Sequence, residues 1–440
     1  MSATFDLAGQ PRQPDAARVR RGRVVAGASP RAVLILLAIV ALPSLPMFFG
    51  VATSMAVGVM LVCLGALAAL AVEQSHAPMW PSRRVALSLV VCLMLSLHAL
   101  VATALQRVDL VRFALSLVLL ATFLMAAIAL SNLLFSVAGP RLHRAIRWVL
   151  AVLVVVGLLG LAGVSPPSPI KFSKPVFPFT EPSHFALSVM PLYLYFAVTT
   201  RGARRLLALS AGLVFALVLQ NMTLLVSALL VLLVCARPFT LVVIAIPVVL
   251  TVPFLDFEYF ASRLDFSPES DNLSVLVFIQ GWQLIEESLR NSHYWGLGFQ
   301  QMGAFGTNVE FADLIYTLIG DNSNLSDGGF TLSKLVSEFG LLGMVLAGVH
   351  FYAALRCGLL LRKVASRRLA LPVGKVLACA VVVAFSVDML IRGNGYFTAS
   401  SLFYLVAVMH LVAERKRRGP ARPRPPRPAM QARPGAMDAR

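Results

Sequence analysis

A carboxylate and an imidazole stand close together in residues 179–185, which read FTEPSHF. Glu181 and His184 are both able to take a proton from a hydroxyl group, which is the role of a general base. The same segment also suits a helix start, because Thr180 or Ser183 can cap it and Glu181 complements the helix dipole. Both interpretations predict a helix beginning here, and only the first predicts a catalytic site.

Glycines, aromatic rings and amides follow one another in residues 293–303, after an apolar stretch from 272 to 282. Glycines let the backbone approach a ligand closely, and aromatic and amide groups beside them suit carbohydrate. Gln280, His293 and Gln300 are the candidate binding residues of this region. A glycine-rich turn over a core helix explains the same pattern without a ligand.

Charged residues mark two later segments, 327–343 and 391–397. The first holds Asp327, a further candidate base, and Lys334, which is spaced to pair with a glutamate four residues later on one helix face. In the second, Arg392 follows Asp388 by one helical turn, so the simplest prediction is an ion pair between them. Together with Arg263, Lys334 and Arg392 are candidate cations for an anionic group, and the planar fork of an arginine can bind two oxygens of such a group at once.

Other common sites are not indicated by the sequence. The five cysteines lie in apolar segments without CxxC spacing, so neither a disulfide framework nor a metal site is expected. The chain has no HExxH motif, no P-loop and no GxGxxG motif in a suitable context. We therefore expect no metal and no cofactor.

The elements that must position these residues are membrane helices. Of 440 residues, 58% are hydrophobic and only 13% are charged, whereas a soluble domain carries about 25% charged residues. Several apolar runs approach or exceed the ~20 residues that cross a bilayer, which predicts an all-α polytopic membrane protein and excludes a soluble enzyme. The formal charge of +18 is spread beside apolar segments and in the tails, so we expect membrane topology rather than nucleic acid to explain it.

Charge placement predicts about twelve transmembrane helices with both termini in the cytoplasm. The stretch 206–253 must contain a break near Gln220, Asn221 and Thr223, because a single helix over 206–235 would place the later basic loop outside. The resulting topology has 30 Lys and Arg inside and 8 outside. The chain then divides into a basic tail (1–31), a first group of spans (32–253), an external segment (254–334), a last group of spans (335–413) and a basic, proline-rich tail (414–440).

The external segment 254–334 is too long and too patterned for a simple connector. Together with Glu338 it holds 12 of the 20 acidic residues of the chain. Residues 273–289 have apolar positions at helical spacing and predict an amphipathic helix that Asp271 or Asn272 caps. Function is expected in this part of the chain.

This layout resembles the bacterial O-antigen polymerase and O-antigen ligase superfamily. The resemblance is carried by Glu181-Pro-Ser-His184, the stretch Trp282 to Gly298, Glu338-Phe-Gly340-Leu-Leu-Gly343 and Arg392-Gly-Asn-Gly-Tyr396. It implies a GT-C-like fold with one large periplasmic loop in the bacterial inner membrane. It also implies transfer of glycan from undecaprenyl diphosphate to an acceptor hydroxyl at the periplasmic face. Expected partners are the lipid-linked donor and acceptor, the bilayer and a chain-length regulator protein.

Within that superfamily the residues favour a polymerase of lipid-linked repeat units. Ligases, which use lipid A core as acceptor, carry a His-Asn pair shortly before the E-x-G motif, where this chain has Gly329 and Phe330. A lipid-linked oligosaccharide flippase would share the twelve-span layout, but it does not need the acidic external segment. A sensor with a periplasmic ligand domain would leave the motifs around Glu181 and Arg392 unexplained.

Overall fold

The computed structural model describes residues 27–73, 82–169, 174, 176–236, 238–254, 257–267, 270, 272–305, 309–320, 328–393 and 395–417. Within these ranges the regular structure is helical, apart from one isolated bridge between Val176 and Phe179. The predicted all-α class is therefore confirmed for the part of the chain that is described.

Among the described residues, seven helical segments are long and apolar enough to cross a membrane. They are α1–η1–α2 (Pro30–Val40, Leu42–Ser44 and Leu45–Phe48), α3 (Met55–Glu73), α4 (Ser82–Leu105), α5 (Leu110–Phe135), α6 (Gly139–Leu161), α14 (Thr331–Ala365) and α15 (Val373–Leu390). Many large apolar side chains on these helices face outward, as lipid-facing surfaces require. The protein is thus a polytopic, membrane-embedded helical bundle.

Five further helices complete the bundle. They are α7 (Pro182–Thr199), α8 (Gly202–Val218), α9 (Met222–Cys235), α10 (Pro238–Thr251) and α16 (Ala399–Arg417). Each of the twelve segments predicted to span the membrane is therefore helical. The predicted break in 206–253 is confirmed, because Gln220 has a positive φ of 50° and the Asn221 side chain caps α9 by accepting a hydrogen bond from the Leu224 N–H.

The predicted turn between the first two spans needs a correction. The sequence predicts it in the region of Pro43, Pro46 and Gly50, but the two prolines lie in η1 and α2, which continue the first helix as far as Phe48. A proline is tolerated in the first turn of a helix, where its missing N–H is not needed. The chain turns at Gly50, the last residue of the predicted region, which has a φ of 68°.

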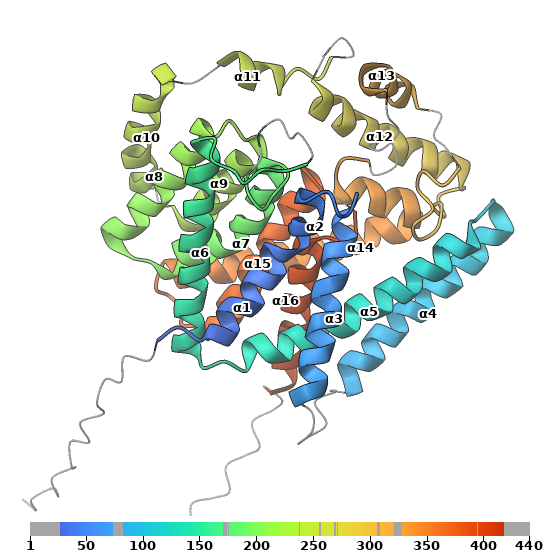
Figure 1. Cartoon of the computed structure of the whole chain (residues 1–440), viewed down its shortest axis with the longest axis horizontal. Helices are drawn as coiled ribbons and strands as arrows, with labels where there is room; N and C mark the ends of the chain where they lie inside the picture. The colour runs from blue at the N-terminus through green and yellow to red at the C-terminus, as the bar shows by residue number, and fades with distance from the viewer. Residues whose placement is uncertain are drawn as a thin grey trace, which may run out of the picture.

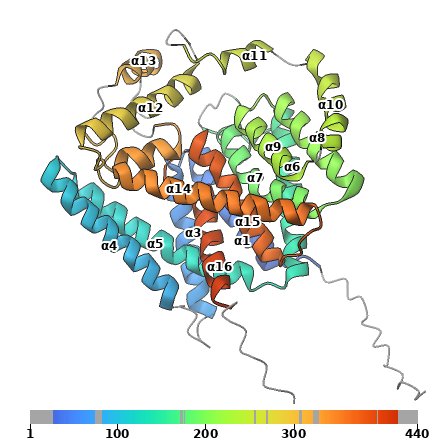
Figure 2. The same cartoon turned by 180° about the vertical axis from the view of Figure 1, so that it is seen from behind.

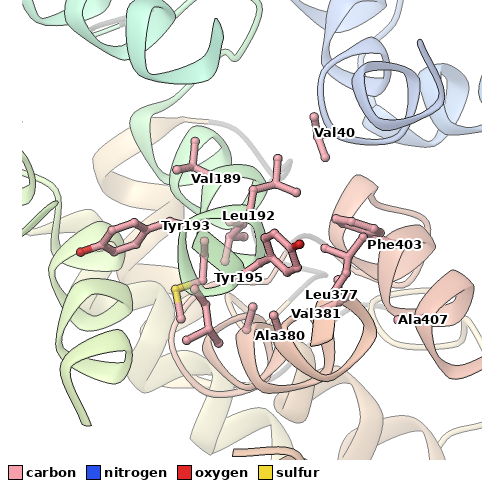
Figure 3. Packing of buried hydrophobic residues seen from close by; sticks show 14 of the residues in the cluster. Val40, Val189, Leu192, Tyr193, Tyr195, Leu377, Ala380, Val381, Phe403 and Ala407 are labelled. Carbon is pink, nitrogen blue, oxygen red and sulfur yellow. The ribbon is translucent and has the colours of Figure 1, made fainter. Parts of the chain in front are cut away.

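The centre of the bundle is the contact of α7 with α15 and α16. Figure 3 shows Leu192 and Tyr195 of α7 packed toward Val381 of α15 and Phe403 of α16. These side chains are almost completely buried. The two helices whose ends carry Glu181 and Asp388 therefore pack in the main hydrophobic core of the bundle.

The segment after α10 lies at one end of the bundle (Figures 1 and 2). It contains η3 (Val252–Phe254), α11 (Phe257–Ser262), α12 (Leu273–Asn291) and α13 (Glu310–Ile319). The predicted amphipathic helix is confirmed as α12, with Asn272 accepting the cap hydrogen bond from the Ser274 N–H. The start of α1 and the end of α16 lie at the opposite end. The predicted boundary at residue 334 falls inside α14, which begins at Thr331.

Candidate functional site

The start of α7 holds Glu181 in place, although not through the predicted caps. Glu181 itself occupies the cap position, with an extended backbone, so neither Thr180 nor Ser183 caps the helix. Ser183 follows the first helical residue, and its hydroxyl donates a hydrogen bond to the Glu181 carboxylate at 2.9 Å. The Thr180 hydroxyl lies 3.1 Å from Nδ1 of His184. The helix start therefore orients the carboxylate and the imidazole separately.

Arg392 forms an ion pair with Glu181, not with Asp388. A guanidinium nitrogen of Arg392 lies 3.0 Å from Oε2 of Glu181. The expected pair with Asp388 is wrong because α15 ends at Leu390, so the chain has left the helix before it reaches the arginine. The Arg392 and Glu181 side chains are 24% and 48% exposed. This cation and carboxylate are therefore accessible from outside the bundle.

The charge state of Glu181 follows from its neighbours. Partial burial raises the pKa of this carboxyl, but the charges of Arg392 and His184 and the hydrogen bonds from Ser183 and Arg392 outweigh it. The net effect is a pKa below the ordinary value for glutamate. Glu181 is accordingly ionised at neutral pH, as its ion pair requires.

Asp388 lies in the interior of the bundle. It is 1% exposed and accepts hydrogen bonds from the hydroxyls of Thr331 and Ser400. A cavity of about 20 Å³ lies beside it, lined by Asp388, Ser188, Ser400 and apolar side chains. That volume holds about one water molecule. The hydroxyls tie the end of α15 to the starts of α14 and α16.

Glu338 is the second buried carboxylate. It accepts hydrogen bonds from the backbone N–H groups of Gln300 at 2.9 Å and Met302 at 3.4 Å. The predicted pairing with Lys334 is present, with the ammonium at 4.0 Å and both side chains almost fully buried. The same ammonium lies over the ring of Tyr396, 5.8 Å from its centroid. Burial and the charge of Glu338 raise the pKa of the Tyr396 hydroxyl, so it remains protonated.

A break in α14 lets the loop after α12 reach Glu338. Gly340 has φ 57° and ψ −131°, which interrupts the helix and frees carbonyl groups of its first part. The N–H of Leu297 donates to the Ser337 carbonyl at 2.9 Å and the N–H of Gly298 to the Glu338 carbonyl at 2.8 Å. A Cβ at Gly340 would lie 2.0 Å from the Tyr294 carbonyl oxygen. Only glycine fits this crossing of the two backbones, which we call the Gly340 crossing.

The four polar segments found in the sequence thus meet at one end of the bundle. The Glu181–Arg392 ion pair joins the first to the last, and the hydrogen bond from the Gly393 N–H to the Gly329 carbonyl, 3.1 Å long, joins the last to the third. Residues 297–302 join the second to the third through Glu338. These backbone and side-chain contacts therefore link a partly exposed cation and an exposed carboxylate to segments that carry two buried carboxylates.

Several predicted site residues occupy other positions. Lys334 is buried, so it is not an exposed cation as we expected. Gln280 is fully buried on α12, and Gln300 contributes its backbone N–H to Glu338. His293 is exposed and has a φ of 50°. His184 is buried beside Thr180.

Two further predicted residues, Arg263 and Asp327, are not among the described residues that form the site. The Arg263 guanidinium stacks over the ring of Tyr259 at 5.2 Å, and none of its described contacts connects it to Arg392. Asp327 falls outside the described residues. The principal contacts that sequence reasoning missed are those of Asp388 with Thr331 and Ser400. The signal for them was an acidic residue within a predicted span, which usually marks a functional or paired position.

No protein-family model, curated protein or solved structure matches the chain. The arrangement of side chains is therefore the basis for assigning a function. A partly exposed arginine suits an anionic group such as a phosphate, and an ionised carboxylate beside it can accept a proton once that arginine binds another group.

Proposed function

We propose that the chain is a glycosyltransferase that polymerises oligosaccharide repeat units carried on undecaprenyl diphosphate. In this proposal all twelve helices of the bundle cross the bacterial inner membrane, both termini are cytoplasmic and the Glu181–Arg392 end is periplasmic. The observation that supports it is the meeting of four polar segments, up to 211 residues apart, around one exposed Arg–Glu pair at an end of an apolar bundle.

Arg392 is the proposed binding group for the diphosphate of the donor. Its guanidinium is partly exposed and presents a planar fork that matches two phosphate oxygens. A diphosphate that departs from the sugar gains negative charge, and a fixed cation beside it stabilises that charge. The isoprenoid chain would lie in the bilayer against the apolar outer faces of the helices, with its diphosphate headgroup at this end of the bundle.

Glu181 is the proposed base. When the diphosphate engages Arg392, the carboxylate loses the cation that lowers its pKa and becomes a stronger proton acceptor. The acceptor hydroxyl oxygen then attacks the anomeric carbon of the donor sugar, and its proton passes to Glu181. The bond between that carbon and the phosphate oxygen breaks, and undecaprenyl diphosphate leaves with the electron pair.

The test is polymerisation by the purified protein supplied with lipid-linked repeat units, read as a ladder of chain lengths on a gel. Arg392→Lys should lose most activity although it keeps the charge, because the planar fork is gone. Glu181→Gln should lower turnover by ~10²-fold or more. The matched controls are Arg31→Lys and Glu73→Gln, because these residues form a similarly exposed Arg–Glu pair at the opposite end of the bundle.

Three results would contradict the proposal. Normal ladders from both site variants, at equal protein abundance, would make the Glu181–Arg392 pair purely structural. Transfer of glycan only when lipid A core is added would identify a ligase. Movement of lipid-linked glycan across vesicle membranes without any new glycosidic bond would identify a flippase.

A further inference from the structure

Phe278, Trp282 and Phe330 form an aromatic cluster between α12 and the start of α14. Phe278 and Trp282 lie one turn apart on α12, with ring centroids 6.3 Å from each other. The ring of Phe330 lies 5.0 Å from Phe278 and 5.2 Å from Trp282. Phe330 is fully buried, whereas Trp282 remains 47% exposed. The indole ring of Trp282 is therefore packed against two other rings while about half of the side chain remains exposed.

The aromatic cluster and Arg392 are connected through neighbouring backbone groups. The carbonyl of Gly329, which precedes Phe330, accepts a hydrogen bond from the N–H of Gly393, which follows Arg392. On the other side of Phe330, the Thr331 hydroxyl donates to Asp388. A ligand with its anionic group on Arg392 therefore has an open indole ring near the same segment of backbone.

We propose that Trp282 is the stacking platform for a pyranose ring of the lipid-linked glycan. This inference rests on the proposed function, because it names where the sugar lies when the diphosphate is on Arg392. The C–H groups on one face of a pyranose form an apolar surface that fits the face of an indole, and its hydroxyls need polar partners at the edge. Glu286 provides one, since it follows Trp282 by one turn of α12 and is exposed.

The carboxylate of Glu286 is available for such hydroxyls. Its present partner is Arg290, at 2.6 Å, but both side chains are more than 70% exposed. An exposed pair of this kind contributes little stability and exchanges readily with other partners. A ring face beside an exchangeable carboxylate is suited to carbohydrate, whereas a ring that anchors the protein in lipid needs no carboxylate beside it.

The experiment compares two probes, undecaprenyl diphosphate alone and the same lipid carrying its repeat-unit glycan, isolated from cells that make this chain. Equilibrium binding of each probe is measured for the full-length protein and for Trp282→Ala, Trp282→Phe and Tyr316→Ala. Tyr316 is a matched control, because it is 49% exposed on the neighbouring helix α13. Thermal unfolding of every variant verifies that it is folded.

The expected result is a selective loss. Trp282→Ala should weaken binding of the glycan-bearing lipid by ~10-fold and leave the bare lipid unchanged, as loss of one aromatic contact predicts. Trp282→Phe should recover most of that affinity, and Tyr316→Ala should match the wild type. If wild type and Trp282→Ala bind the glycan-bearing lipid equally and polymerisation is intact, the proposed role of Trp282 is refuted and the proposed function stands.

Two other outcomes have separate meanings. If Trp282→Ala weakens both probes equally, the indole anchors the protein in the lipid headgroup region and the platform is refuted. If neither probe binds the wild-type protein and no ladder forms, the proposed function itself fails, and the inference that rests on it fails too.

Discussion

Gly340→Ala should disrupt the site without altering any charged or polar side chain. The new Cβ would lie 2.0 Å from the Tyr294 carbonyl oxygen, about 1.4 Å short of the 3.4 Å at which ordinary van der Waals contact begins. A shift of that size breaks the three backbone hydrogen bonds of the Gly340 crossing, which involve Leu297, Gly298 and Leu341. At about 1 kcal/mol each they contribute about 3 kcal/mol. Strain of an L-residue at φ 57° and ψ −131° adds about 1–3 kcal/mol.

The expected loss in the free energy of unfolding is therefore about 4–6 kcal/mol, measured by unfolding of the purified protein in detergent. Polymer synthesis should fall with it, because the N–H groups that bind Glu338 lie on the displaced loop. Gly348→Ala is the control, since it lies on the same helix with open space around its Cβ, and it should stabilise the protein by up to about 1 kcal/mol. Equal unfolding free energies for Gly340→Ala and wild type would refute the account of the crossing.

The remaining predictions concern charge. The pKa of Glu181 is lowered in the folded protein, so its ion pair stabilises the fold above the unfolded pKa and is lost as pH falls through the folded pKa. The difference in melting temperature between wild type and Arg392→Gln should accordingly stay constant from pH 8 to about pH 5 and shrink below about pH 4, and a constant difference down to pH 3 would contradict it. Lys334→Met should cost about 3–5 kcal/mol, because it leaves Glu338 buried without its cation, and adding Glu338→Gln should recover part of that loss in a double-mutant cycle. We expect a reporter that functions only in the periplasm to be active when fused at Ser270. Activity of a reporter that functions only in the cytoplasm, fused at the same position, would contradict the predicted topology.

The helices could be predicted from the sequence because the bilayer imposes a strong pattern. Long uncharged runs must be helical to satisfy their backbone groups, and the distribution of arginine decides where a run must be divided. The split at Asn221 followed from this rule, and the structure has a capped helix start there. The predicted turn between the first two spans was right at Gly50 and wrong at Pro43 and Pro46, because a proline is compatible with the first turn of a helix as well as with a loop.

The site could be predicted only in part, because its contacts depend on where helices end. The spacing of Asp388 and Arg392 suggested an ion pair. Because Arg392 lies two residues beyond the end of α15, its side chain is not on the helix face of Asp388 and pairs with Glu181. The pairing of Lys334 with Glu338 was predicted correctly because both lie on one continuous turn of α14. The backbone donors from Gln300 and Met302 carry no signal in their residue types, since any residue has an N–H group.

The ion pair between Glu181 and Arg392 cannot form until late in the synthesis of the chain. The two residues are 211 positions apart, so at ~5–20 residues per second the ribosome needs about 10–40 s to pass from one to the other. For most of that interval α7 is already made, while the chain that will carry the arginine does not yet exist. A nascent chain that stops after α15 would contain all seven described helical segments that are long enough to cross a membrane, but neither the ion-pair partner of Glu181 nor the Ser400 donor of Asp388.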